Sequence, residues 1–393
     1  MSAFGNLSNI TNTSYERLGL AAGNVNLSDA YCRISLTDSQ ASIIERLPQL
    51  FAEARRTRLP DLEREFIGRY LQLAGEPQIP DASRCMFSYS ASCAITMVAS
   101  YCAIRGKTVA LLEPTYDSIP SILRRERVTL IPIREQDFRT DNIGTAFTET
   151  QPDVVWLISP NNPTGWMIDR SCFLTLVEWC TENYCTLVID AAFRFFRRPS
   201  WSLYEILEHS QVSYVVLEDT GKTWPTSGMK VGIAVCSTDM FTEMYRQHDD
   251  LLQGVSPFQL RVLSEFADDS LSQGLAGTLQ SAIRDSRTIL RTELNIEHFR
   301  FATSLDSPIS VDWVELRTGP DCERFIAAAA DQGVQVLPGT NFYWTERDRG
   351  RRMIRIALAR DPELVATGGR LLSATAQSFH NSATSNQSRT YQR

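Results

Sequence analysis

Residues 214–232 read YVVLEDTGKTWPTSGMKVG, and this is the most informative stretch of the chain. A short apolar run ends on two acids, of which Asp219 is the second. Lys222 follows three residues later, and Lys230 lies eight residues beyond Lys222. Ligands of open α/β sheets collect at the carboxyl ends of the strands. A strand that ends on a carboxylate and a lysine therefore predicts a chemical site.

Further segments with the pattern of buried strands lie on both sides of this stretch. They are VALLEP (109–114), VVWLISP (154–160), TLVID (186–190) and VGIAVCS (231–237). Helical patterns alternate with them, for example RSCFLTLVEWCTENY at 170–184. This alternation predicts an α/β fold with a mostly parallel sheet that helices cover on both faces.

The pattern along the chain predicts four regions. A large α/β domain spans 46–257, and a linking helix with a small α+β domain spans 258–375. The N-terminal segment 1–45 joins the small domain. The polar composition of 376–393 predicts a disordered tail.

Composition favours small-molecule chemistry. The chain has 393 residues and a net charge of -7, which gives no electrostatic reason to bind nucleic acid or an anionic membrane. No apolar run approaches the roughly 18 residues of a membrane helix, and the start lacks the pattern of a signal peptide, so we expect a cytoplasmic protein. The nine cysteines form no CxxC pair and the four histidines are scattered, which argues against disulfides, a metal site or a Ser-His-Asp hydrolase.

Other strand ends also carry polar or aromatic residues. Asp190 ends TLVID, Asn162 lies in SPNNPTG (159–165), and Tyr116 lies in EPTYD (113–117). SYSASCAITMVA (88–99) is a turn of small residues that opens a helix, and such a helix start offers backbone N–H groups to a phosphate. Each of these features alone also fits a turn or a helix cap. Their common order and spacing do not follow from that explanation.

Over roughly residues 40–375, this order of motifs resembles the fold type I pyridoxal 5'-phosphate enzymes, the aspartate aminotransferase superfamily. The resemblance implies a pyridoxal phosphate cofactor and a homodimer whose sites form at the subunit interface. It implies that Lys222 bonds to the cofactor aldehyde as a Schiff base and that Asp190 pairs with the pyridinium nitrogen. Asn162 would bind the ring hydroxyl and Tyr116 would stack on the ring. The phosphate would be held by Ser90, Ala91 and Ser92.

The chain departs from the superfamily pattern in three places. Lys230 stands where an arginine usually binds the phosphate, so the charge stays but the bidentate fork is lost. Phe193 replaces a tyrosine that donates to the ring oxygen. Asp219 replaces a serine or threonine near the phosphate, where a carboxylate is repulsive unless a cation lies between them.

Arg355 agrees with the family pattern, because it stands where the family holds the substrate α-carboxylate.

Four stretches resemble a smaller branch, the dioxygen-using L-arginine oxidases and hydroxylases of enduracididine-type biosynthesis. They are TSYE (13–16), NLSDAYCR (26–33), EDTGKTWPT (218–226) and LLQGVSPF (251–258). The resemblance implies that an N-terminal segment closes over the site. The residues that it implies for the substrate guanidinium are Thr13, Glu16, Asp29 and Asp219. TSYE is also a capping-box pattern, so helix capping is the alternative for Glu16 and Asp29.

Tyr31 stands where this branch has a histidine implicated in placing water, which puts hydroxylation in doubt. Three activities stay open. One is dioxygen-dependent oxidation of L-arginine to a dehydro or hydroxy 2-oxo acid. The second is cyclisation of a hydroxyarginine to enduracididine or capreomycidine, and the third is class I/II transamination. A cofactor-bound regulator is a non-enzymatic alternative, although the pattern predicts no appended DNA-binding module.

Overall fold

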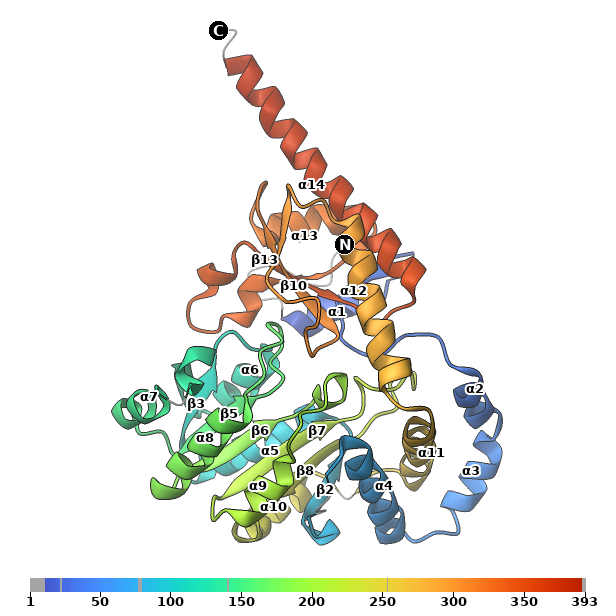
Figure 1. The fold of residues 1–393 in the computed structure, drawn as a ribbon, viewed down its shortest axis with the longest axis vertical. Helices are drawn as coiled ribbons and strands as arrows, with labels where there is room; N and C mark the ends of the chain where they lie inside the picture. Colours follow the sequence, from blue (N-terminus) through green and yellow to red (C-terminus); the bar gives the residue numbers. More distant parts are fainter. Residues whose placement is uncertain (1–10, 22, 77–79, 140, 253, 391–393) are drawn as a thin grey trace.

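The structure, a computed structural model, describes residues 11–21, 23–76, 80–139, 141–252 and 254–390 (Figure 1). Its larger part is built on a seven-stranded sheet in the order β2-β8-β7-β6-β5-β3-β4. The strands are β2 (Cys85–Ser88), β3 (Thr108–Leu112), β4 (Thr129–Ile133), β5 (Val154–Ile158), β6 (Thr186–Asp190), β7 (Tyr214–Asp219) and β8 (Gly232–Cys236). Only β8 runs against its neighbours β2 and β7, and the other pairs are parallel. The predicted α/β fold with a mostly parallel sheet is confirmed.

The central strands are buried along their whole length. Every residue of β5, β6, β7 and β8 is buried, because helices cover both faces of the sheet. In Figure 1, α8 and α9 lie in front of the sheet and α5 lies behind it. The helices of this part are α4 (Leu59–Ala74), α5 (Ala91–Ile104), α6 (Ser118–Arg125), α7 (Ile143–Thr150), α8 (Arg170–Glu182), α9 (Leu203–His209), α10 (Thr238–Leu251) and α11 (Pro257–Gln273).

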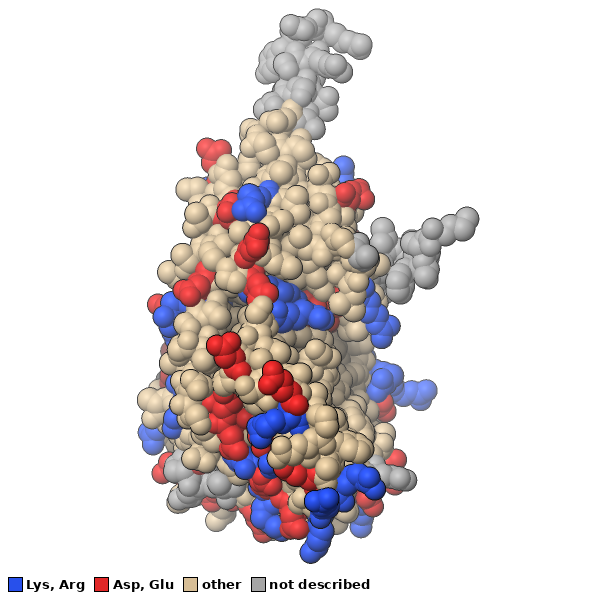
Figure 2. Space-filling model, turned by 90° about the vertical axis from the view of Figure 1, so that its right-hand side faces the viewer, with Lys and Arg blue, Asp and Glu red and all other residues tan. Residues whose placement is uncertain are grey.

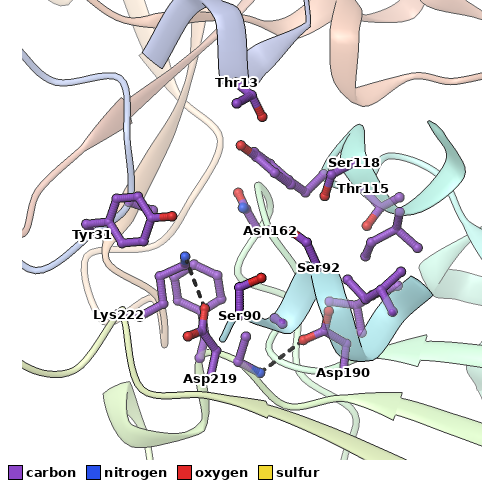
Figure 3. Close-up of a pocket in the computed structure, with 18 of the residues that line it drawn as sticks. Thr13, Tyr31, Ser90, Ser92, Thr115, Ser118, Asn162, Asp190, Asp219 and Lys222 are labelled. Carbon is purple, nitrogen blue, oxygen red and sulfur yellow. Dashed lines mark hydrogen bonds and ion pairs between the residues drawn. The ribbon is translucent and has the colours of Figure 1, made fainter. Parts of the chain in front are cut away.

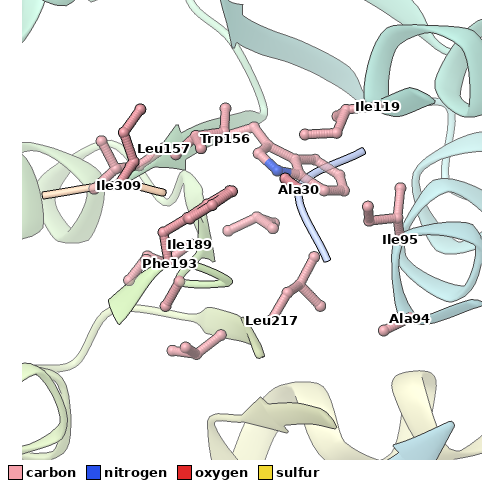
Figure 4. Close-up of a cluster of buried hydrophobic side chains, with 14 of the residues drawn as sticks. Ala30, Ala94, Ile95, Ile119, Trp156, Leu157, Ile189, Phe193, Leu217 and Ile309 are labelled. Carbon is pink, nitrogen blue, oxygen red and sulfur yellow. The ribbon is translucent and has the colours of Figure 1, made fainter. Parts of the chain in front are cut away.

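Apolar side chains from the strands and helices meet beneath the carboxyl ends of the strands (Figure 4). Ile189 of β6 and Leu217 of β7 lie in this cluster, and Trp156 of β5 is fully buried there. Apolar burial of this kind contributes roughly 25 cal/mol per Å². The cluster thus gives the strand ends a fixed, dry support.

The smaller part holds a four-stranded antiparallel sheet in the order β12-β13-β10-β9. Its strands are β9 (Phe299–Phe301), β10 (Val311–Leu316), β12 (Leu337–Pro338) and β13 (Met353–Ala357), and its helices are α12 (Ser281–Glu293), α13 (Cys322–Asp331) and α14 (Pro362–Thr390). Near the N-terminus, α1 (Asn12–Leu18) packs on β11 (Val334–Gln335) and β12, and β1 (Val25–Asn26) pairs with β11. The early residues are therefore held against the small sheet.

Two further helices, α2 (Asp38–Glu45) and α3 (Leu47–Ala54), pack against α11. A π-helical turn at Ala276–Gln280 then leads into α12. In Figure 1, α12 runs up from the large part to the small part. The chain thus passes between its two parts along a helix.

The end of the chain belongs to α14, which is helical to Thr390, and residues 391–393 lie outside the described part. The disordered tail over 376–393 stays a prediction from composition. The start of α14 packs on α12 and α13. Once such a helix is nucleated, each added residue gains one hydrogen bond, and no glycine or proline interrupts 371–390.

On the face shown in Figure 2, acidic and basic side chains are interspersed over the lower, larger part. Among the described residues, no helix has both the length and the apolarity needed to cross a bilayer. The same residues include no group of three or more His, Cys, Asp or Glu side chains placed to hold a metal ion.

Candidate active site

A cavity of about 200 Å³ lies where the sheet's carboxyl ends face α1 and β13 (Figure 3). It brings together nearly all of the site residues that the sequence predicted. These are Thr13, Glu16, Tyr31, Ser90, Ala91, Ser92, Tyr116, Asn162, Asp190, Asp219, Lys222, Lys230 and Arg355. Asp29 is the one predicted residue that does not line the cavity.

Asp219 and Lys222 form an ion pair on the cavity wall. Asp219 is the last residue of β7, and one carboxylate oxygen lies 3.4 Å from Lys222 Nζ. The other oxygen accepts the Gly221 N–H at 2.8 Å, which fixes the carboxylate in the turn before the lysine. Burial disfavours the charged form of Lys222, but Asp219, Tyr31 and Glu16 together outweigh this effect and raise the pKa of the lysine. The amine is therefore held as a cation in the absence of a ligand.

The ring of Tyr31 lies close to both lysines. Lys222 Nζ is 4.5 Å from the ring centroid and Lys230 Nζ is 4.1 Å from it, both within cation–π range. The Lys230 ammonium also donates a hydrogen bond to the Tyr31 hydroxyl. Tyr31 thus contacts both cations of the cavity.

Asp190 is a buried carboxyl group at the end of β6. One oxygen accepts the Ala192 N–H at 3.0 Å. Burial raises the pKa of Asp190 to about 6, an effect that Asp219 strengthens and that Lys222 and the Ala192 N–H oppose. A cationic N–H group placed beside Asp190 would stabilise its charged form.

The turn before α5 forms a cradle of donors. Ser90 caps α5, and Ala91 and Ser92 are its first helical residues, whose N–H groups have no intrahelical acceptor. Strand β8 passes this turn so closely that a Cβ on Gly232 would lie 2.3 Å from the Ser90 carbonyl carbon. Only glycine allows this approach, which keeps the cradle open toward the cavity.

The opposite wall carries Arg355 of β13, which is fully buried. Its guanidinium donates to the Ser28 carbonyl and lies 3.5 Å from both Asn162 Oδ1 and Glu16 Oε1. Its Nε has no hydrogen-bond partner among the described residues. A buried cation with a free donor is prepared to accept an anionic ligand group.

Glu16 reaches the cavity from α1 and accepts a hydrogen bond from the Tyr116 hydroxyl at 2.9 Å. The N-cap of α1 is Thr11, whose side chain accepts the Ser14 N–H. Thr13 and Glu16 therefore do not form the capping box that TSYE allowed. Both are free to face the cavity.

Asp29 lies behind the cavity wall. Its carboxylate pairs with Arg360 at 3.1 Å and with Arg33 at 3.2 Å, and it also accepts the Tyr31 N–H. Burial alone would raise the pKa of Asp29, but the two arginines hold it below its ordinary value. In this geometry Asp29 fixes the backbone that presents Tyr31 and does not point at a ligand.

Sequence reasoning missed Thr115 and Ser118, which line the cavity on either side of Tyr116. The Thr115 hydroxyl is buried and has no partner among the described residues. Both residues lie close to Tyr116 in the segment that follows β3. Their polar side chains at that strand end are the signal that could have identified them.

The donor set fits pyridoxal phosphate. Lys222 supplies an amine for the aldehyde, and Asp190 supplies a buried carboxyl group that forms no ion pair with a described residue. The cradle at Ser90 and the Lys230 ammonium supply N–H, hydroxyl and positive groups for a phosphate. Asn162 and Tyr116 lie between these groups and Arg355. The phenylalanine at position 193 also lines the cavity, with no hydroxyl to offer.

The sequence pattern of the family described as "Aminotransferase class I and II" matches residues 28–367. The structure of MppP soaked with the product 2-ketoarginine superposes with a TM-score of 0.83 at 31% identity, over 89% of this chain and 99% of that one. LysN, an α-aminoadipate aminotransferase from Thermus thermophilus, gives a TM-score of 0.77 at 16% identity, over 95% of this chain and 96% of that one. At that identity the second likeness shows the fold alone.

Curated relatives match more locally. Histidinol-phosphate aminotransferase of Candida maltosa is 29% identical over 37% of this chain and 39% of its own length. Aromatic amino acid aminotransferase of Cutibacterium acnes is 23% identical over 56% of this chain and 60% of its own length. The matched regions thus span less than two thirds of these relatives.

Proposed function

The chain belongs to the aminotransferase class I and II family of pyridoxal phosphate enzymes, and we propose that it oxidises L-arginine to a 2-oxo acid with dioxygen. One observation carries the choice of substrate. Two carboxylates, Glu16 and Asp219, line the same cavity as the buried Arg355. A cavity that holds a buried arginine and two carboxylates suits a ligand that carries both a carboxylate and a delocalised cation.

The bound cofactor supplies an electron sink for negative charge that develops at the substrate Cα. The chain's own residues supply the rest. Asp190 would stabilise a cationic ring N–H, and Lys230 with the cradle at Ser90 would hold the phosphate. Lys222 would bind the aldehyde through Nζ, and its amine, when free, would take the proton from the substrate Cα.

Arg355 would hold the substrate α-carboxylate, because its Nε and Nη2 donate in one plane. Its contact with Glu16 is loose, at 3.5 Å, so a substrate carboxylate competes with a weak partner. Glu16 then becomes available for the guanidinium. Asp219 provides the second carboxylate, and Thr13 of α1 adds a hydroxyl to the cavity lining.

MppP, with 2-ketoarginine as its product, is the relative that supports this substrate. The curated relatives support a second candidate, since the names in that comparison are aminotransferases. We further propose a homodimer, in keeping with the fold type I enzymes that the chain resembles.

The two candidates differ in their co-substrate. The pyridoxal phosphate-loaded protein is incubated with L-arginine in air, with and without an added 2-oxo acid, while dissolved oxygen and products are followed. An oxidase consumes oxygen and needs no added 2-oxo acid. An aminotransferase converts the added 2-oxo acid to an amino acid and leaves oxygen unchanged.

Replacing Asp219 by asparagine is expected to weaken L-arginine binding far more than cofactor binding. Losing one charged hydrogen bond to a guanidinium costs about 1.5–3 kcal/mol, or roughly tenfold to a hundredfold in affinity. Titration of the loaded protein with L-arginine measures this change. Asp29→Asn is the matched variant. Asp29 is bound to Arg33 and Arg360 and does not line the cavity, so a loss of arginine affinity that is specific to Asp219→Asn supports the place of Asp219 in the pocket. If Asp219→Asn instead loses the cofactor and keeps its affinity for arginine, Asp219 serves the phosphate.

Tyr31 is expected to limit hydroxylation of the product. At neutral pH a phenol donates a hydrogen bond but is a poor general base, whereas an imidazole exchanges protons readily. The wild-type enzyme should therefore release mainly an unhydroxylated 2-oxo acid from L-arginine, and Tyr31→His should raise the hydroxylated fraction. Tyr31→Phe, which keeps the ring, is the control.

Mass spectrometry of the products formed in air and under nitrogen measures the hydroxylated fraction. A dominant 4-hydroxy-2-oxo acid from the wild type would contradict this role of Tyr31. A cyclic product from 4-hydroxyarginine under nitrogen would instead support the cyclase alternative, in which the guanidine nitrogen adds in place of water.

A further inference from the structure

Asp117 is a buried carboxylate next to the cavity that has no part in the roles above. It occupies the N-cap position of α6, where an aspartate usually binds its own helix, but its side chain makes no such bond. One carboxylate oxygen instead accepts the backbone N–H of Asn12 at 2.8 Å. Asn12 is the first residue of α1, and 105 positions separate the two partners in the chain.

The same two residues also carry complementary unused groups. Asp117 Oδ1 and Asn12 Nδ2 are both buried, and neither has a hydrogen-bond partner among the described residues. A carboxylate oxygen accepts from an amide N–H, so these two groups are chemically able to form a second bond beside the first. On its other side, Asn12 Oδ1 accepts from Asn341 Nδ2 at 3.2 Å. Asn12 thus ties α1 to both parts of the molecule.

The negative charge of Asp117 is buried, and the hydrogen bond from the Asn12 N–H helps to stabilise it. No ion pair joins Asp117 to a cation in the part of the chain that the structure describes. Burial raises the pKa of Asp117 to about 6, and Glu16 adds to the effect, whereas the Asn12 N–H and Arg355 oppose it. Above that pH the group is ionised. Hydrogen bonds to an ionised acceptor are roughly twice as strong as neutral ones.

Helix α1 carries two of the side chains that line the cavity, Thr13 and Glu16. Glu16 lies one helical turn beyond Asn12, so a shift of Asn12 would displace both of them. We infer, on the basis of the proposed function, that Asp117 is a positioning residue that fastens α1 over the cavity and so places Thr13 and Glu16 against the guanidinium end of the substrate. Asp117 itself is not among the residues that line the cavity.

Hydrogen–deuterium exchange of the backbone amides in residues 11–18 tests this inference on the full-length, pyridoxal phosphate-loaded protein at neutral pH. Asp117→Leu should speed exchange in this segment about tenfold or more, since one charged hydrogen bond is lost. Asp117→Asn keeps an acceptor oxygen for the Asn12 N–H and should show a smaller increase. The matched control is Asp169→Leu, which removes an aspartate that does cap its own helix, α8, by accepting the Cys172 N–H at 2.8 Å.

Kinetics give the second readout. Asp117→Leu should raise the KM for L-arginine about tenfold with a smaller change in kcat, and Asp117→Asn should restore part of the affinity. Equal exchange of residues 11–18 in the wild type and Asp117→Leu would overturn the inference. So would the same acceleration in Asp169→Leu, because the effect would then reflect general destabilisation.

The same experiments distinguish a failure of the proposed substrate from a failure of the role of Asp117. If Asp117→Leu frees residues 11–18 but L-arginine neither slows exchange in the wild type nor reacts, the fastening of α1 by Asp117 stands and the proposed substrate is wrong. If L-arginine reacts and Asp117→Leu leaves exchange and KM unchanged, the proposed substrate stands and the role of Asp117 is wrong.

Discussion

Replacing Lys222 by alanine is expected to lower turnover at least about a thousandfold and to remove the visible absorbance band of the loaded protein. The loss combines two functions of one amine, the bond to the cofactor aldehyde and the transfer of the Cα proton. General base catalysis alone is worth about 10²–10⁴-fold. Lys222 lies just after the end of β7, whereas Lys230 lies before β8 and donates to the Tyr31 hydroxyl.

Lys230→Ala is the matched control for this experiment. It removes a cation from the same cavity, so it should weaken cofactor binding through the phosphate while the visible band persists at high cofactor concentration. Absorbance spectra and steady-state rates of both variants are measured after loading. Loss of the band in Lys230→Ala with its retention in Lys222→Ala would reverse the assignment of the two lysines.

Replacing Asp190 by asparagine is expected to have opposite effects on stability and on activity. Without the cofactor, burial raises the pKa of Asp190 from 3.8 to about 6, so the ionised group destabilises the folded state at pH 7. A shift of that size corresponds to about 3 kcal/mol. The neutral asparagine avoids this cost. The cofactor-free variant should therefore unfold at an equal or higher temperature than the cofactor-free wild type.

With the cofactor bound, the same substitution leaves a buried ring cation without its carboxylate. Breaking a buried charge pair by removing one partner costs about 3–5 kcal/mol, or roughly two to four orders of magnitude in rate. Thermal unfolding with and without cofactor, together with steady-state rates, measures both halves of the prediction. A cofactor-free variant that is markedly less stable, or a loaded variant with wild-type rates, would show that Asp190 is a structural residue.

Most of the site was predictable because its residues are local to strand ends. Asp190 and Asp219 each close a buried strand, and Lys222 follows within one turn. Since parallel strands end at the same edge of a sheet, the alternation of strands and helices was enough to bring these residues together. The order of motifs then indicated the cofactor, and the family match supports it.

The features that could not be predicted from the sequence depend on contacts between residues that are distant in the chain. The carboxylate of Asp29 pairs with Arg360, which lies 331 residues away in the chain, and no local sequence pattern around Asp29 predicts that ion pair. The bond from Asn12 to Asp117 is equally non-local. The helix α14 is nucleated on α12 and α13, and composition alone does not predict that packing.

The central claim is that dioxygen, and not a 2-oxo acid, receives the electrons taken from L-arginine. Oxygen uptake by the pyridoxal phosphate-loaded protein, measured with L-arginine as the sole substrate and with Lys222→Ala as the blank, tests it most directly. The account predicts uptake that depends on L-arginine and yields a 2-oxo acid. Absence of uptake, together with amino transfer from L-arginine to an added 2-oxo acid, would contradict it.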